Sequence, residues 1–92
     1  MQLNDEAADL AEHIEVSIQT PNGTWPTEGF FEVPVQQKIE QQLDHTRTSL
    51  KIENTDNWVA MADHKKLDPT TSYRRNGLAR RVSIYYGPPP KR

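Results

Sequence analysis

The spacing of apolar side chains changes twice along this chain, and the order of these changes limits the folds open to it. Residues 14–18 alternate between apolar and polar side chains, which is the two-residue period of a half-buried strand. Residues 35–43 carry an apolar side chain at every fourth position, which is typical of an amphipathic helix. The alternation returns over residues 81–86. We therefore expect a strand near the start, one helix in the middle and a strand near the end.

Two further apolar segments complete the predicted elements. Residues 30–33 form a second apolar run, and the turn residues 21–23 before them predict a hairpin with a long, irregular connection. Residues 58–62 are dense in apolar side chains, as in a central strand. Pro34 is suited to the first position of the helix that follows it. The predicted order is strand, strand, helix, strand, strand.

A chain of 92 residues has room for one domain. Residues 4–6 can cap a short N-terminal helix, and a frayed extension is the alternative for the same segment. We assign residues 1–12 to this extension or short helix and residues 13–87 to the folded domain. The proline run in residues 88–92 favours an extended polyproline conformation, so this segment is expected to be a Pro-rich tail.

The predicted order is that of a β-grasp sheet, in which the first and last strands pair in parallel at the centre while the helix crosses one face. In residues 58–68 a predicted strand is followed by a turn, two lysines, Leu67 and Asp68. This segment resembles the part of ubiquitin in which a buried strand ends in a turn, a lysine, a leucine and an acidic residue. Residues 68–73 and 76–78 resemble the loop by which a ubiquitin-like chain enters its last strand.

The chain is thus similar to the ubiquitin-like family, in element order over residues 13–87 and in residue detail over residues 58–87. The resemblance implies an α+β fold, a ubiquitin-like β-grasp with a mixed four- to five-stranded sheet, one crossing helix and a short N-terminal helical extension. Three features depart from the family pattern. The loop after the helix is longer, the helix lacks the usual Thr or Ser cap, and a terminal Gly-Gly pair is absent.

The sequence looks more similar to divergent bacterial ubiquitin-like proteins than to eukaryotic ubiquitin. Such proteins are encoded beside activating enzymes, conjugating enzymes and metal-dependent peptidases in conjugation or antiphage operons. The resemblance implies a cytoplasmic protein modifier or its precursor, which is a substrate of these enzymes and not an enzyme itself. Two other functions stay open: a β-grasp interaction adaptor that is never conjugated, and a small nucleic-acid-binding domain.

Gly87 is the candidate residue for conjugation or processing. A modifier of this family presents a glycine carboxylate to its activating enzyme, and Gly87 is the one glycine near the end of the last predicted strand. The resemblance implies that a peptidase removes residues 88–92. The opposing interpretation is that Gly87 ends the strand and that the tail is solubilising. The bond to be cut would be Gly-Pro, which many peptidases refuse.

Several kinds of chemistry are excluded by what the sequence lacks. It has no cysteine, so disulfides, a thiol nucleophile and thiolate metal sites are ruled out. The histidines His13, His45 and His64 are not at metal-ligand spacing, so we expect no metal ion, and no motif indicates a cofactor. No apolar stretch approaches the roughly 20 residues that span a bilayer, and the N-terminus is acidic, unlike a secretory signal. We expect no membrane association.

Charge is divided unevenly along the chain. Residues 1–46 contain nine acidic residues and one basic residue, whereas residues 47–92 contain four acidic and ten basic residues. This asymmetry favours an acidic partner at the C-terminal half. Basic residues interleaved with tyrosines are also the pattern of nucleic-acid binding, against which the sequence pI of about 5.9 argues. The candidate partner-binding residues are Trp58, Met61, Arg80, Arg81, Tyr85 and Tyr86. Strand alternation predicts that Trp58 or Val59 faces solvent, but not both.

Overall fold

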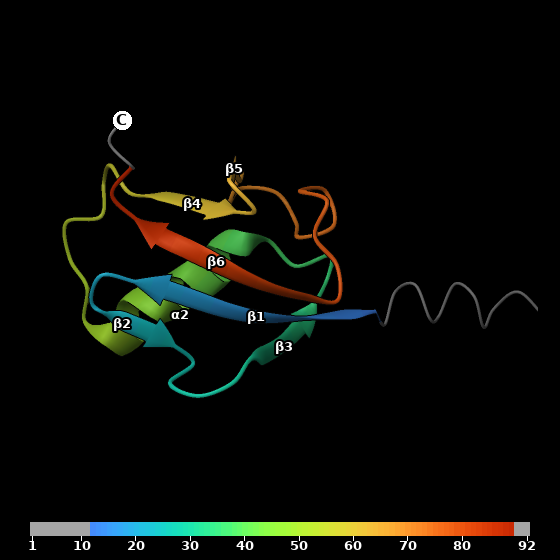
Figure 1. Cartoon of the computed structure of the whole chain (residues 1–92), viewed down its shortest axis with the longest axis horizontal. Helices are drawn as coiled ribbons and strands as arrows, with labels where there is room; N and C mark the ends of the chain where they lie inside the picture. Colours follow the sequence, from blue (N-terminus) through green and yellow to red (C-terminus); the bar gives the residue numbers. More distant parts are fainter. Residues whose placement is uncertain (1–11, 90–92) are drawn as a thin grey trace, which may run out of the picture.

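A mixed sheet with one helix across one of its faces organises residues 12–89, the part of the chain that the computed structural model describes (Figure 1). The elements are β1 (His13–Thr20), β2 (Gly23–Trp25), β3 (Phe31–Pro34), α2 (Ile39–Leu50), β4 (Val59–Ala62), β5 (Lys65–Lys66) and β6 (Arg81–Gly87). The strands are ordered β2-β1-β6-β4-β5, and β3 also pairs with β1. The predicted N-terminal helix lies outside the described residues. None of the helical segments in residues 12–89 has the length and apolar character needed to cross a membrane.

β1 and β6 lie side by side at the centre of the sheet and run in the same direction (Figure 1). Their register pairs Val16 with Val82 and Ile18 with Ile84. These side chains are at most 8% exposed, and each stabilises the fold by about 1.5–3 kcal/mol through burial of its apolar surface. The predicted parallel pair at the centre is confirmed, and the chain has the α+β architecture of a β-grasp.

The antiparallel partner of β1 is divided into two short strands. β2 pairs with the end of β1, where Thr20 faces Gly23, and β3 pairs with its beginning, where Ile14 faces Val33. The Thr20 hydroxyl donates to the carbonyl oxygen of Gly23 at 2.8 Å, so the turn after β1 is tight. What the prediction misses is the short strand β2, which pairs with β1 before the irregular connection begins. The irregular segment lies further on, between β2 and β3.

α2 begins at Ile39, later in the chain than predicted. Pro34 is the last residue of β3 and not the first of the helix, which corrects the predicted start. Val35 is buried, and its N–H donates to the carbonyl oxygen of Glu12 at 3.1 Å. Val35 and Ile39 are buried in the same core and lie four residues apart. In the sequence this spacing looks like one turn of a helix, although Val35 lies before the helix.

The N-terminus of α2 is capped by a loop from much later in the chain. The N–H of Ile39 donates to the carbonyl oxygen of Thr71 at 3.1 Å, and the N–H of Glu40 donates to that of Pro69 at 2.9 Å. Lys38, which precedes the helix, makes no side-chain cap. The first N–H groups of a helix have no partner within it, so this loop provides the acceptors that a Ser or Thr cap usually supplies.

Asn76 organises the loop that leads into β6. Its side-chain amide donates to the carbonyl oxygens of Asp68 and Ser72 and to the Thr71 hydroxyl, at 2.8–3.1 Å. Its Oδ1 accepts the N–H of Asp68 at 2.8 Å. One side chain thus ties together the segment that caps α2 and the segment that enters the last strand. The same loop therefore positions both elements.

Candidate functional site

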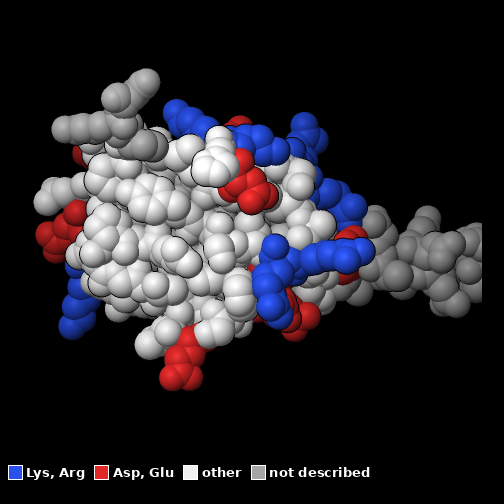
Figure 2. Space-filling model, in the orientation of Figure 1, with Lys and Arg blue, Asp and Glu red and all other residues white. Residues whose placement is uncertain are grey.

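The face of the sheet that points away from α2 is the candidate functional surface. Strand alternation places Ser17 and Gln19 of β1 on this face, together with Ser83 and Tyr85 of β6. Figure 2 shows that uncharged side chains form much of its centre, while Lys and Arg lie along its upper and right margins. An uncharged, partly apolar surface bordered by polar groups is typical of protein interaction sites.

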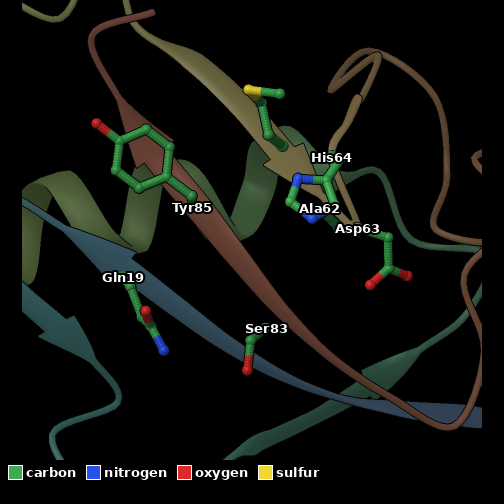
Figure 3. A pocket seen from close by; sticks show the side chains of 7 residues that line it. Gln19, Ala62, Asp63, His64, Ser83 and Tyr85 are labelled. Carbon is green, nitrogen blue, oxygen red and sulfur yellow. The ribbon is translucent and has the colours of Figure 1, made fainter. Parts of the chain in front are cut away.

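A hollow of about 300 Å³ opens on this face (Figure 3). The register of the sheet determines its centre, because Tyr85 faces Gln19 across β1 and Met61 across β4. These three side chains form one row over three strands. Tyr85 is 39% exposed and Met61 is half-buried. The residues that line the hollow are Gln19, Met61, Ala62, Asp63, His64, Ser83 and Tyr85.

The rim of the hollow beyond β4 is a two-residue turn. Asp63 and His64 both have positive φ, of 54° and 63°, and the flanking Ala62 and Lys65 are paired. This is the geometry of the tight hairpin turn that glycine and asparagine usually occupy. The turn brings both side chains to the hollow, where Figure 3 shows them beside Ala62.

The groups around the hollow are suited to binding a side chain of another protein. The Tyr85 ring and the Met61 thioether offer apolar contact, and the amide of Gln19 and the hydroxyls of Ser83 and Tyr85 can donate or accept hydrogen bonds. Within residues 12–89, no group of three or more His, Asp or Glu side chains is placed to hold a metal ion. The hollow can therefore receive an apolar side chain of a partner, while polar groups next to that side chain form hydrogen bonds with the residues at its edge.

Gly87, the predicted conjugation residue, is the last residue of β6 and is buried. It faces Val59 across the antiparallel pair with β4. A methyl group on its α-carbon would lie 2.5 Å from the hydroxyl oxygen of Tyr85 and 3.1 Å from Cδ of Pro21, so any side chain here would force the Tyr85 ring to shift. The Tyr85 hydroxyl also donates to the carbonyl oxygen of Pro88 at 3.3 Å. The exposed chain begins only at Pro88.

Of the predicted partner-binding residues that are apolar or aromatic, some lie at the surface and some in the core. Met61 and Tyr85 meet at the hollow, as the residues of one row. Tyr86 is 4% exposed and its hydroxyl accepts a hydrogen bond from Nη1 of Arg47 at 2.7 Å, so its assignment to the surface is wrong. Trp58 packs edge-on against Tyr86, with ring centroids 5.2 Å apart. Trp58 and Val59 are both half-buried, so neither is the fully outward residue that alternation predicts.

The two predicted arginines at the start of β6 are exposed but differ in their contacts. Arg81 donates to Oε1 of Glu15 at 2.7 and 2.8 Å, and its guanidinium lies 4.6 Å from the centroid of the Phe30 ring. Arg80 has a φ of 66°, and its carbonyl oxygen accepts the N–H of Glu15 at 2.8 Å. Within residues 12–89 the side chain of Arg80 has no ion pair, as is also true of Lys65 and Lys66. These three cations can therefore meet acidic groups of a partner.

Exposed aromatic residues at the edge of the sheet are absent from the sequence prediction. Phe30 and Phe31 are 38% and 43% exposed. Trp25 lies 5.0 Å from the Phe31 ring and stacks on His45 of α2 at 6.0 Å between centroids. The sequence does carry one signal, because two adjacent aromatic residues in a strand cannot both face the core.

Comparison with known proteins reveals similarity of fold. No protein-family model matches the sequence, and no curated protein sequence is significantly similar to it. A solved de novo design based on ubiquitin has a TM-score of 0.63 and 16% identity, over 82% of this chain and 87% of the design. A ubiquitin-like domain of an Arabidopsis thaliana protein has a TM-score of 0.62 and 13% identity, over 82% of this chain and 76% of that domain's chain. The ubiquitin of Caldiarchaeum subterraneum has a TM-score of 0.59 and 12% identity, over 86% of this chain and 96% of that ubiquitin. At these identities the likeness concerns the fold alone.

Proposed function

We propose that this chain, which has the ubiquitin-like β-grasp fold, is a protein-interaction domain that binds partners through the hollow and the sheet face around it. The row of Gln19, Tyr85 and Met61 carries the proposal, because it presents an exposed aromatic ring beside a thioether on a largely uncharged face. In this role the chain has no catalytic centre of its own. Tyrosine in such a position is a common anchor of interfaces.

The charges around the face define the partner further. Lys66 is exposed and is the direct antiparallel partner of Met61, so it lies on the same face as the hollow, whose centre is largely uncharged. A partner with one apolar side chain for the hollow and acidic residues beside it matches this distribution. The acidic residues would speed association through long-range attraction, and the apolar anchor would provide most of the affinity.

A charge placed in the hollow tests this function. Met61→Glu puts a carboxylate beside Tyr85, and Ser49→Glu puts the same charge on the exposed surface of α2 as a matched control. A partner isolated with the wild-type domain is purified, and its Kd is measured by calorimetry. We expect Met61→Glu to raise the Kd at least about thirtyfold, which corresponds to about 2 kcal/mol, and Ser49→Glu to leave it unchanged. Equal affinity of the two folded variants would refute the proposal.

Conjugation is the second candidate function, and the position of Gly87 favours it. Gly87 ends the last strand and directly precedes the exposed Pro88. In this proposal a metal-dependent peptidase removes residues 88–92, an activating enzyme adenylates the new carboxylate and a conjugating enzyme carries it. The end of β6 must first leave Val59, since a buried carboxylate in the sheet is out of reach. A bacterial conjugation or antiphage operon is the proposed setting.

Mass spectrometry distinguishes the modifier from the adaptor. The chain is expressed together with the enzymes encoded beside it, and the conjugating enzyme is examined for a thioester under non-reducing conditions. We expect a species that ends at Gly87 and a thioester-linked adduct, and a chain truncated after Gly87 should form the adduct without the peptidase. Recovery of only full-length, unconjugated protein, with no adduct from the truncated chain, leaves the interaction domain as the function.

A further inference from the structure

Tyr85 borders two features of the molecule at once. Its side chain lines the hollow together with Met61 and Ser83. The hydroxyl end of its ring lies over Gly87, and the hydroxyl donates to the carbonyl oxygen of Pro88 at 3.3 Å. Figure 3 shows the ring standing on β6 at the edge of the hollow. A change in the position of this one ring therefore affects both the hollow and the end of β6.

The end of β6 is covered mainly by this ring. Gly87 has no side chain, yet it is buried, and the Tyr85 ring and the ring of Pro21 lie where a Cβ on this residue would be. Beneath the Tyr85 ring, Gly87 is paired with Val59 of β4. Loss of this cover would expose the last pair of the β4–β6 ladder to water. Strand ends with little cover open locally far more often than the whole domain unfolds.

The hollow is also the space into which the ring can turn. Side chains in strands lean along the strand in either of two common rotamers. In one rotamer the Tyr85 ring leans toward Gly87, as in the structure, and in the other it leans toward Ser83, which lines the hollow. A group that fills the hollow therefore blocks the second rotamer.

We propose that Tyr85 is a latch that couples partner binding in the hollow to release of the chain after β6. When the hollow is filled, the ring stays over Gly87 and β6 stays paired with Val59. When the ring turns toward Ser83, Gly87 leaves Val59 of β4. This inference rests on the proposed role of the hollow as a partner site. It means that a partner in the hollow and an enzyme that needs Gly87 released exclude each other.

A covalent group in the hollow tests the latch without any partner. The chain has no cysteine, so Ser83→Cys provides one thiol at the hollow, and Ser49→Cys provides one on the exposed surface of α2 as the matched control. Both variants are labelled with benzyl methanethiosulfonate, which attaches a benzylthio group. Amide hydrogen exchange of Gly87 and Val59 is then followed by NMR. We expect the label at residue 83 to slow exchange of this pair at least about threefold, and the label at residue 49 to have no effect.

Substitution of Tyr85 should have the opposite effect to the label and speed amide exchange at the end of β6. Tyr85→Ala should speed exchange of the Gly87 and Val59 amides about tenfold, while the amides of β1 keep their rates, and the hollow label should no longer slow exchange. Tyr85→Phe keeps the ring but not the bond to Pro88, so a smaller increase is expected, and this variant serves if Tyr85→Ala does not fold. The latch is refuted if the label at residue 83 leaves exchange unchanged or speeds it. It is also refuted if neither substitution changes the rates.

The outcome is independent of the partner experiments. Exchange rates are measured on the isolated chain, so failure of the latch leaves the interaction face intact. Conversely, loss of the proposed partner site through an unchanged affinity of Met61→Glu would leave the Tyr85 motion measurable but without the role assigned to it.

Discussion

The hydroxyl of Tyr73 donates a hydrogen bond to Oε1 of Gln42 at 3.2 Å, and both side chains are buried. The bond joins α2 to the loop that leads into β6. Burial raises the pKa of Tyr73 well above its ordinary value, because an ionised phenol loses the solvation it has in water. This core contact therefore helps to fix the strand that carries Tyr85, although it lies on the opposite side of the sheet from the hollow.

Removal of the Tyr73 hydroxyl should destabilise the domain. In Tyr73→Phe the amide oxygen of Gln42 loses this donor in a buried site, which costs about 1–2 kcal/mol in the free energy of unfolding. Urea denaturation followed by circular dichroism measures the effect. Tyr85→Phe is the control, because its hydroxyl bond is exposed and its loss should change the stability by less than about 0.5 kcal/mol. Equal losses in the two variants would contradict the role of the buried pair.

High pH should reduce the stability that Tyr73 provides. Its pKa is raised on folding, so above the ordinary value of about 10 the unfolded chain loses this proton while the folded chain keeps it. The folded state then binds more protons, and the free energy of unfolding falls as pH rises. The stability difference between wild type and Tyr73→Phe should therefore narrow between about pH 9 and about pH 11 in urea titrations. If the difference in free energy of unfolding between wild type and Tyr73→Phe stays constant with pH, the pKa of Tyr73 is not raised by folding.

The carboxyl of Asp68 should titrate below its ordinary pKa. The Thr70 hydroxyl donates to its Oδ1 at 2.6 Å and the Thr70 N–H donates at 3.1 Å, and these bonds lower the pKa of Asp68 in that order of size. Thr70→Val removes the hydroxyl donor and should raise this pKa toward the ordinary value, as measured by NMR of the carboxyl carbon. The stabilisation from Asp68 is present above its unfolded pKa and is lost as pH falls through the folded value.

Thr71→Val is the matched control for the Asp68 titration. The Thr71 hydroxyl donates to the backbone carbonyl oxygen of Asp68 and not to its carboxylate. We therefore expect Thr71→Val to leave the pKa of the Asp68 side chain where it is. If both valine variants shift the titration alike, the hydrogen bond from Thr70 is not its cause.

A side chain at residue 87 should collide with the Tyr85 ring. Gly87→Ala is expected to lower the free energy of unfolding by about 1–3 kcal/mol, because the added methyl group forces the Tyr85 ring out of its position. In a Tyr85→Ala background the same substitution should cost much less. A double-mutant cycle by urea denaturation should give a coupling of about 1 kcal/mol or more. Equal costs in both backgrounds would mean that Pro21, and not Tyr85, limits the space.

The central strands could be predicted because their signal is local. Residues 14–18 and 81–86 alternate in sequence since one face of each strand is buried under the same helix. β2 is too short to show a period. The predicted start of α2 is too early because Val35 is buried outside the helix at a helical spacing, and because the acceptors for the first N–H groups come from a distant loop.

The candidate site could be predicted only in part, because some of its residues follow a local pattern and others are brought together by distant segments. Met61 and Tyr85 occupy outward positions of their strands, which alternation can identify. The prediction places Tyr86 on the same surface as Tyr85 and is wrong, because neighbouring residues of a strand face opposite sides. Gln19 and His64 join the hollow through strand register and a turn, which involve segments far apart in the sequence. The contact of Tyr85 with Gly87 depends on a side-chain rotamer, and no sequence pattern specifies that.

Pro69 and Thr71 follow α2 in the chain, so the ribosome releases this helix before the acceptors for its first N–H groups exist. β1 has the same relation to β6, its parallel neighbour, which is synthesised last. Neither element has its partners until these later segments have been synthesised. Folding is therefore expected only after β6 has left the exit tunnel, and until then the apolar faces of β1 and α2 lack the segments that cover them.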